Sequence, residues 1–277
     1  IKELAFNWDA SSRPNVIGKS DENGQPLIPS TGETSPVLLA EVLGRRLLAK
    51  TDHPAIKQAL AQIESRKQQA VAQPSKEFRV PHYCPGCPHN RGTSTPEGSI
   101  AMAGIGCHSL AMWMPNNDTV TFTHMGAEGA NWIGAQAFVD QKHIFQNVGD
   151  GTYAHSGSLA IRAAQAAGCT MTFKILYNDA VAMTGGQPVE THFSVLDIAR
   201  QILAEGINKV VVVADDLKKY DAYGPDYKFP PEVELFGREE MTSVMRACRE
   251  YQGVSVLIYD QVCATERRRR RKRGDMP

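Results

Sequence analysis

The sequence predicts an α/β protein with a mostly parallel sheet flanked by helices. Short β-branched runs alternate with helical patterns from residue 119 onward, and this alternation is typical of βαβ units. The chain has 277 residues, of which 42% are apolar, enough for one large domain or two small ones. No run of 18 or more apolar residues occurs, so we expect no membrane segment.

The N-terminal part differs from the rest. Residues 1–33 contain turn formers without periodicity and are expected to be irregular. Helices are expected from about Pro36 to Leu48 and over 54–72, while 74–98 is rich in Pro and Gly. The predicted strands are 119–123, 144–148, 171–177, 210–214 and 254–259. The predicted helices between them are 129–139, 157–167, 194–204 and 238–251.

The formal net charge of zero conceals an asymmetry. Residues 267–273 are seven consecutive basic residues, and outside 267–277 the chain carries 23 basic and 29 acidic residues, a net charge of −6. Such a run can bind nucleic acid or an anionic membrane. Because no aromatic residues are interleaved with it, we expect no nucleic-acid or membrane binding but a structural or interdomain role. The start at Ile1 and the end after the basic run suggest a segment of a longer protein or a processed subunit.

The strongest motif follows the predicted strand 144–148. Gly149-Asp150-Gly151-Thr152 lies there, and Asn178 follows the strand 171–177, 28 residues after Asp150. Neighbouring strand ends would bring a carboxylate and an amide oxygen together, and Mg²⁺ prefers such ligands beside phosphate oxygens. The flanking glycines would let an anion approach the backbone, near the start of a helix. The alternative is an ordinary turn with an unrelated asparagine.

The six cysteines are too few for a disulfide scaffold and indicate metal or redox use in a reducing compartment, so we expect a cytoplasmic protein. Cys84 and Cys87 form a C-x₂-C pair, Cys107 follows 20 residues later, and Cys263 lies 156 residues beyond it. A Cys₄ shell could hold zinc or an iron–sulfur cluster, and the spacing leaves both open. Cys169 and Cys248 are expected to be buried, apolar cysteines.

Several ordered motifs resemble a known family. Gly149–Thr152 with Asn178 resembles the signature of thiamine diphosphate enzymes, and VAMTGGQ at 181–187 resembles that of the 2-oxoacid:ferredoxin oxidoreductases. Further runs resemble the thiamine-binding portion of indolepyruvate ferredoxin oxidoreductases. They are CPGCPH (84–89), GIGCHS (104–109), THMGAEGAN (123–131) and CATERRRRRKRG (263–274). The resemblance is good over about 80–273 and loose over 1–50.

The resemblance implies roles at matching positions. Asp150 and Asn178 would bind Mg²⁺ by their side chains and Ala180 by its carbonyl. Met125 would be the apolar wedge under the thiazolium, or a core methionine. His155 would polarise the oxoacid or shuttle a proton, or only support the site. The cofactor-binding residues would further include Gly149, Gly151, Thr152, Thr184 and Gly185. A [4Fe–4S] cluster would be held by Cys84, Cys87, Cys107 and, as the weakest match, Cys263.

The implied reaction is oxidative decarboxylation of an arylpyruvate such as indolepyruvate to an acyl-CoA, with electrons passed through the cluster to ferredoxin. The family also uses a glutamate on a pyrimidine-binding domain, and no such segment is present here. A partner chain or the rest of the same polypeptide must supply it, and a homodimer is expected. The alternatives are a non-oxidative thiamine-dependent 2-oxoacid decarboxylase and a non-enzymatic zinc-binding module.

These expectations divide the chain into three parts. Residues 1–75 would be a linker or helical N-terminal segment. Residues 76–266 would be the thiamine diphosphate-binding domain with its iron–sulfur cysteines. Residues 267–277 would be a basic tail or a linker to a following domain.

Overall fold

A computed structural model describes residues 1–72, 80–114, 118–189 and 191–275. The chain divides into two compact units, Ile1–Arg79 and Val80–Pro277. The expected boundary between residues 75 and 76 lies outside the described residues. None of the helices in the described ranges is both long and apolar enough to cross a membrane.

The first unit contains a pair of packed helices, α2 (Pro36–Leu48) and α3 (Pro54–Ala72), as the periodicity predicts. Helix α2 begins where Ser35 accepts a hydrogen bond from the Leu38 N–H at 3.2 Å, and a proline occupies its first turn. The two helices approach closely at Gly44, where an added Cβ would lie 3.0 Å from Leu60 Cδ2. The expectation of an irregular N-terminus is wrong at α1 (Lys2–Phe6), a short helix.

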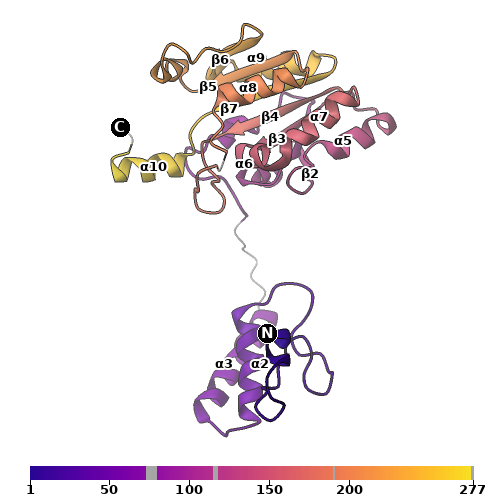
Figure 1. The fold of residues 1–277 in the computed structure, drawn as a ribbon, viewed down its shortest axis with the longest axis vertical. Helices are drawn as coiled ribbons and strands as arrows, with labels where there is room; N and C mark the ends of the chain where they lie inside the picture. The colour runs from indigo at the N-terminus through magenta and orange to yellow at the C-terminus, as the bar shows by residue number, and fades with distance from the viewer. Residues whose placement is uncertain (73–79, 115–117, 190, 276–277) are drawn as a thin grey trace. The chain divides into compact units, whose positions relative to one another are not determined.

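The second unit is built on a seven-stranded sheet in the order β2-β1-β3-β4-β7-β5-β6, and every neighbouring pair of strands is parallel (Figure 1). The predicted α/β fold with a mostly parallel sheet is thereby confirmed. The strands are β1 (Ile100–Ala103), β2 (Thr119–Phe122), β3 (Ile144–Gly149), β4 (Met171–Tyr177), β5 (Lys209–Ala214), β6 (Val233–Gly237) and β7 (Val254–Asp260).

Five of these strands match predicted ones, and two were missed. β1 is a four-residue strand with two alanines, too short and too weakly β-forming to stand out. β6 lies at the sheet edge, and its sequence VELFG includes an exposed glutamate that breaks the apolar run. Both errors concern strands whose pairing with the central sheet compensates for weak local preference.

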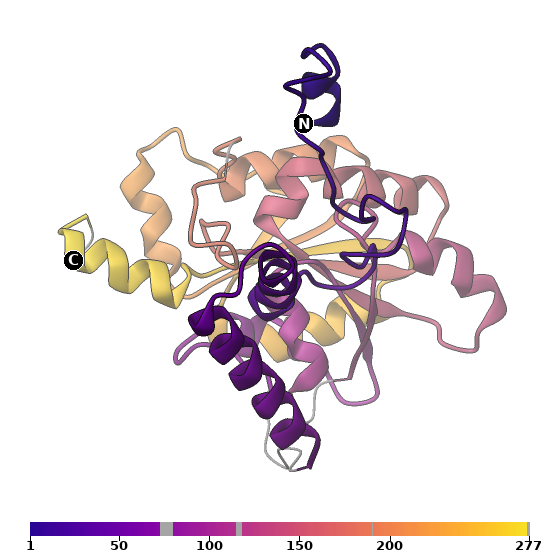
Figure 2. The ribbon, with the colours of Figure 1, turned by 90° about the horizontal axis from the view of Figure 1, so that it is seen from below.

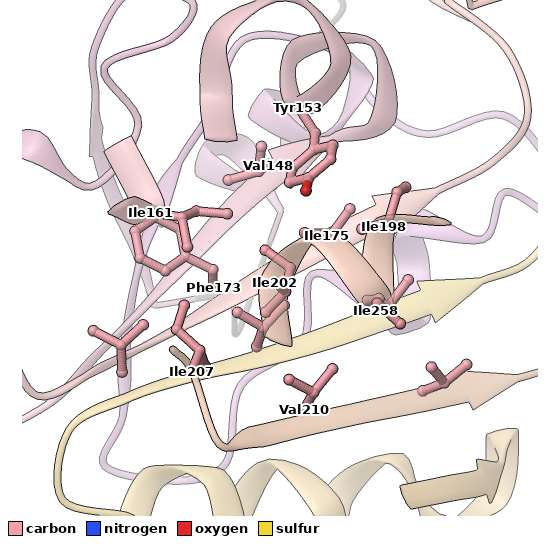
Figure 3. Packing of buried hydrophobic residues seen from close by; sticks show 14 of the residues in the cluster. Val148, Tyr153, Ile161, Phe173, Ile175, Ile198, Ile202, Ile207, Val210 and Ile258 are labelled. Carbon is pink, nitrogen blue, oxygen red and sulfur yellow. The ribbon is translucent and has the colours of Figure 1, made fainter. Parts of the chain in front are cut away.

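Helices cover both faces of the sheet, so the central strands are apolar on both sides. Residues of α5, α7 and α8 pack on one face, where Ile161 and Ile202 meet Phe173, Ile175 and Val210 (Figure 3). Residues of α9 pack on the other. These helices are α5 (Ala130–Ala135), α7 (Ser158–Ala166), α8 (Val195–Ala204) and α9 (Met241–Glu250). A further short helix is α4 (His89–Gly92), and 3₁₀ turns are η1 (Cys107–Trp113), η2 (Gln136–Phe138), η4 (Leu217–Tyr223) and η5 (Arg238–Glu240).

The helix after β3 begins earlier than predicted. The expected start near residue 157 is wrong, because α6 (Asp150–Thr152) and a π-helical turn, η3 (Tyr153–Gly157), precede α7 in one continuous helical run. The glycines at 151 and 157 obscured this start, since glycine is a poor helix former. Asp150 therefore lies in the first helical turn, directly at the carboxyl end of β3.

The basic run is also helical. Most of residues 267–277, expected as a tail or linker, belong to α10 (Ala264–Arg273), which extends from the carboxyl end of β7 and is drawn in yellow (Figures 1 and 2). Arginine and lysine are good helix formers, and cations in the last turn interact favourably with the helix dipole. The helix ends at Gly274, whose φ of 82° suits a glycine.

Candidate functional site

Asp150 organises the loop that follows β4. β3 and β4 are neighbours in register, with Gly149 paired to Leu176, so the residues after each strand lie side by side. The Asp150 Oδ2 accepts hydrogen bonds from the N–H groups of Asn178 and Asp179, each at 2.9 Å, and Oδ1 accepts one from Gly151 at 2.8 Å. The structure thus brings together the carboxylate and the amide that the sequence motif pairs.

The electrostatics of this pair suit a cation. Burial raises the pKa of Asp150 to about 6, and its three backbone hydrogen bonds favour the charged form against this effect. Among the described residues, the buried Asn178 Oδ1 has no hydrogen-bond partner, while Nδ2 lies 3.4 Å from His89 Nε2. Because buried polar atoms are nearly always paired, this amide oxygen remains free to accept a ligand. These oxygens fit Mg²⁺, which binds to few protein oxygens in addition to phosphate and water.

A cavity of about 420 Å³ opens at this position. Its lining includes nearly all residues predicted to bind the cofactor or act on the substrate: Met125, Gly149, Asp150, Gly151, Thr152, His155, Asn178, Ala180 and Thr184. Met125 is 42% exposed, so it is not a core methionine. The His155 Nδ1 lies 2.7 Å from Ser156 Oγ.

Gly185 is the exception, since the cavity lining does not include it. Its carbonyl accepts a hydrogen bond from Arg269 Nη1 at 2.6 Å, which turns this peptide toward α10. The surrounding turn is closed by hydrogen bonds from Val181 N–H to the Gln187 carbonyl (2.8 Å) and from Gly186 N–H to the Val181 carbonyl (3.0 Å). At Gly186, φ is 83° and a Cβ would lie 2.1 Å from Glu266 Oε1, so only glycine fits.

The four cysteines predicted to bind a cluster interact with one another. A hydrogen bond of 3.0 Å from Cys87 N–H to the Cys84 carbonyl closes the C-x₂-C turn. Burial raises the pKa of Cys87 to about 11, and the nearby thiols of Cys107, Cys263 and Cys84 raise it further. Cys107 also lines the cavity. Four soft sulfur donors in one region suit an iron–sulfur cluster or zinc.

The thiols do not form a closed coordination shell. In the described part of the chain, no three His, Cys, Asp or Glu side chains lie close enough together to hold a metal ion. All six cysteines are free, and Cys169 and Cys248 are buried as expected. The chemistry of the donor set therefore fits a cluster, while its geometry in this structure does not by itself define one.

Two buried histidines complete the inner wall of the cavity. The rings of His89 and His108 lie 5.7 Å apart, edge to face. Burial lowers the pKa of His89 to about 4 and that of His108 to about 3, so both imidazoles are neutral at pH 7. Each histidine closely follows a predicted ligand cysteine in the sequence. This adjacency is the signal by which the sequence places both histidines near the site.

Two buried ionisable residues add further hydrogen bonds. Glu128 lies in the run THMGAEGAN, whereas the sequence gives no signal for Lys174. Glu128 is fully buried and accepts hydrogen bonds from the N–H groups of Gly126 (2.6 Å) and Ile105 (3.4 Å). It thereby joins the Met125 loop to the loop that precedes Cys107. Lys174, within β4, is also fully buried and donates a 2.9 Å hydrogen bond to the Ser94 carbonyl. A lysine inside an apolar strand gives no periodic pattern that would identify it.

Comparison with known proteins identifies related chains. The chain is 29% identical to the indolepyruvate oxidoreductase subunit IorA of Archaeoglobus fulgidus, over 76% of this chain and 32% of that protein. It is 25% identical to the subunit of the same name from Pyrococcus horikoshii, over 96% of this chain and 40% of that protein. The chain thus spans about a third of the length of the first relative and two fifths of the second.

A solved structure shows a similar fold. It is the 2-oxoglutarate:ferredoxin oxidoreductase from Magnetococcus marinus, with 2-oxoglutarate, coenzyme A and succinyl-CoA bound. The TM-score is 0.51 at 18% sequence identity, covering 69% of this chain and 66% of that chain. At this identity, the similarity supports the fold alone.

The family model described as the C-terminal TPP-binding domain of thiamine pyrophosphate enzymes matches residues 104–258, more than half of the chain. The matched range contains Asp150, Asn178 and most of the cavity lining. Together with the two relatives, this match confirms the resemblance to the thiamine-binding portion of indolepyruvate ferredoxin oxidoreductases. The chain therefore belongs to the thiamine pyrophosphate enzymes and carries their C-terminal TPP-binding domain.

Proposed function

We propose that this chain is the thiamine diphosphate- and Mg²⁺-binding part of an oxidoreductase that converts arylpyruvates to acyl-CoA. Electrons would leave through a [4Fe–4S] cluster to ferredoxin. The observation that carries the proposal is the cavity whose lining includes Asp150 and Asn178 together with Cys107. One site then combines oxygen ligands for a metal–diphosphate with a sulfur ligand for an electron carrier.

The residues of this chain would hold the cofactor at its diphosphate end. Asp150, Asn178 and the Ala180 carbonyl would bind Mg²⁺, and Gly149, Gly151 and Thr152 would contact the diphosphate. At Gly151 an added Cβ would lie 3.3 Å from Val181 Cγ2, so a larger residue would crowd the loop that follows β4. Thr184 would contact the cofactor from the opposite loop, and Gly185 would support that loop through its bond to Arg269.

Thiamine diphosphate, when bound, supplies a carbon nucleophile and an electron sink for decarboxylation. Met125, which is half-exposed in the cavity wall, would press against the cofactor and exclude water. His155 lines the same cavity, and its Nε2 would exchange a proton with the oxoacid while Nδ1 pairs with Ser156.

Electron transfer would begin next to the cavity. Cys84, Cys87, Cys107 and Cys263 would bind the cluster as thiolates. For Cys87 and Cys107 this requires deprotonation of thiols whose pKa burial has raised. Cys263 is tied to the cofactor loop, because its N–H donates a 3.0 Å hydrogen bond to the Asn178 carbonyl. The path from the cofactor to the cluster would then be short.

The complete activity requires more than this chain. A pyrimidine-binding domain or partner chain would contribute the activating glutamate, and the enzyme would form a homodimer. The 2-oxoacid, coenzyme A and ferredoxin would bind to the assembled enzyme. The six free cysteines support a reducing compartment, which we propose to be the cytoplasm.

The test uses the full-length enzyme, purified without oxygen. Iron and acid-labile sulfide are quantified, and EPR spectra are recorded after reduction with dithionite. About four irons per thiamine site and a reduced-cluster signal are expected. Coenzyme A-dependent reduction of ferredoxin by indolepyruvate is measured in the same preparation. Cys263→Ala should lose or alter the EPR signal, whereas the matched control Cys248→Ala, a buried cysteine of α9, should not.

The alternatives give different results. Zinc without iron or sulfide, and no thiamine binding, would indicate a zinc-binding module. A colourless enzyme that decarboxylates the oxoacid without reducing ferredoxin would indicate a non-oxidative decarboxylase. A normal cluster in Cys263→Ala would leave the function standing and show that another residue is the fourth ligand.

A further inference from the structure

Helix α10 contacts the loops that surround the candidate site. Arg268 Nη2 donates a 2.5 Å hydrogen bond to the Pro85 carbonyl in the C-x₂-C turn. Arg269 Nη1 donates to the Gly185 carbonyl at 2.6 Å. Arg270 binds to Asp179 twice, from Nη1 to the carboxylate Oδ2 at 2.6 Å and from Nη2 to the carbonyl at 3.0 Å. Three consecutive arginines thus reach two loops, the C-x₂-C turn and the loop between β4 and α8.

The residues of this helix differ in burial and in pairing. Glu266, Arg269 and Arg270 lie at i, i+3 and i+4 on one face, with Glu266 buried and paired to Arg269. Arg267 and Lys272 are exposed. In the described part of the chain, no hydrogen bond or ion pair involves either of these two side chains. The basic run therefore contains side chains that bind to loops of the candidate site and side chains that point to solvent.

Asp179 is the residue on which this contact acts most directly. Its φ is 59°, a left-handed conformation that non-glycine residues adopt only when their surroundings hold them in it. In this conformation, its N–H points to Asp150 Oδ2. Asp179 also lies between Asn178 and Ala180, which supply the proposed Mg²⁺ ligands. Arg270 forms hydrogen bonds with both the side chain and the main chain of Asp179, and a planar guanidinium is suited to such a two-point contact.

We propose that Arg270 is a positioning residue, which holds the 178–180 loop in the conformation that presents the Asn178 amide oxygen and the Ala180 carbonyl to Mg²⁺. This inference rests on the proposed function. It assigns to the basic helix a role within the cofactor site, in addition to a role in the stability of the fold. Loss of a residue that orients metal ligands typically weakens metal binding by about 10-fold to 100-fold.

The experiment compares four forms of the full-length protein: wild type, Arg270→Ala, Arg270→Lys and the matched control Arg267→Ala. Mg²⁺ is titrated at saturating thiamine diphosphate, and binding is followed by quenching of protein fluorescence. Arg270→Ala should bind Mg²⁺ at least about 10-fold more weakly. Arg270→Lys should recover part of the loss, because an ammonium keeps the ion pair but does not reach the carbonyl in a planar fork. Arg267→Ala should equal wild type.

A second readout needs no cofactor. Hydrogen exchange of the backbone amides of 178–182 should be faster in Arg270→Ala than in Arg267→Ala, while the melting temperatures of the two variants should agree. A purely structural role would lower the melting temperature without a selective loss of Mg²⁺ binding. Should Arg270→Ala not fold, Arg270→Lys would still be compared with Arg267→Ala in both measurements.

A double variant tests the mechanism. Glycine adopts the left-handed conformation without strain, so Asp179→Gly should make Arg270 unnecessary. In the Asp179→Gly background, Arg270→Ala should change Mg²⁺ affinity by less than about 2-fold. The inference is overturned if Arg270→Ala binds Mg²⁺ like wild type, or if it costs as much with glycine at 179 as with aspartate. If wild type itself does not bind Mg²⁺ and thiamine diphosphate, the proposed function fails and this inference fails with it.

Discussion

Lys174 offers a test of the electrostatics of the sheet that is independent of any ligand. The residue lies in the middle of β4, fully buried, 5.4 Å from the centre of the Phe145 ring. The Ser94 carbonyl accepts its hydrogen bond. Among the described residues, no carboxylate forms an ion pair with it. Burial without a counter-charge disfavours the ammonium, and it lowers the pKa of Lys174 from 10.5 to about 7.

The magnitude and sign follow from this shift. Each pKa unit corresponds to about 1.4 kcal/mol, so a shift from 10.5 to about 7 corresponds to about 5 kcal/mol. Between these two pH values the unfolded chain holds the proton and the folded chain does not, so the free energy of unfolding rises with pH. The full free-energy cost of burying Lys174 is present below about pH 7, and this cost decreases by about 1.4 kcal/mol for each pH unit above that value.

The measurement compares wild type with Lys174→Met, which keeps the unbranched side chain and removes the charge. Urea unfolding is followed by the fluorescence of the buried Trp132, after Trp8 and Trp113 have been replaced by phenylalanine in both proteins. Between pH 7.5 and 9.5, the stability of wild type relative to the variant should increase by about 3 kcal/mol. Groups that titrate equally in both proteins contribute equally to both stabilities, so their contributions cancel in the difference.

A control variant shows whether the Lys-to-Met substitution itself changes the pH dependence of stability. Lys218 is exposed on η4, and Lys218→Met measures the effect of the same substitution on the surface. A pH-independent difference for Lys174→Met would refute the reasoning, because it would show that the buried lysine keeps its proton throughout. The reasoning would also be refuted if the stability of wild type relative to Lys174→Met decreased as the pH rises.

Three further predictions concern the loops of the site. Glu128→Ala should destabilise the protein by about 1–3 kcal/mol in urea unfolding, because two half-buried N–H groups lose their acceptor; Glu128→Gln retains an acceptor and should recover part of this loss. Gly186→Ala should lower the melting temperature more than Gly224→Ala, since both glycines have positive φ but only Gly186 faces a close neighbour; equal losses would contradict the crowding against Glu266. Mg²⁺ affinity should be constant above pH 7 and fall by about 10-fold per unit below pH 6, because protonation of Asp150, whose pKa burial raises to about 6, removes a ligand charge; titrations at pH 5, 6, 7 and 8 would show no such fall if Asp150 is not a ligand.

Much of the fold could be predicted from local patterns, and the exceptions share a cause. The five predicted strands are apolar, β-branched runs, and this pattern can be recognised without knowing how the strands pair. β1 and β6 lack this pattern and exist because their backbone groups pair with strong neighbours. The start of the helix at Asp150 was missed for a similar reason, since its glycines suggest a turn until the strand before them is placed.

The candidate site shows the same division. Asp150 and Asn178 could be paired from the sequence because parallel strands end at one edge of a sheet, and the spacing of one strand–helix unit fixes which ends are neighbours. The interaction of Lys174 with Ser94 joins residues 80 positions apart. No local preference encodes such a contact, and the chain must be folded before it can be seen.

The sequence by itself determined the fold class, the two strand ends that build the candidate site and the membership in a family of thiamine enzymes. These properties depend on periodicity and on residues at fixed short spacings. Only the tertiary structure decided that the Asn178 oxygen lacks a partner among the described residues, that Gly185 turns away from the cavity and that Arg270 reaches Asp179. Each of these depends on side chains from distant segments, and their distances and burial are set by packing, which sequence spacing does not specify.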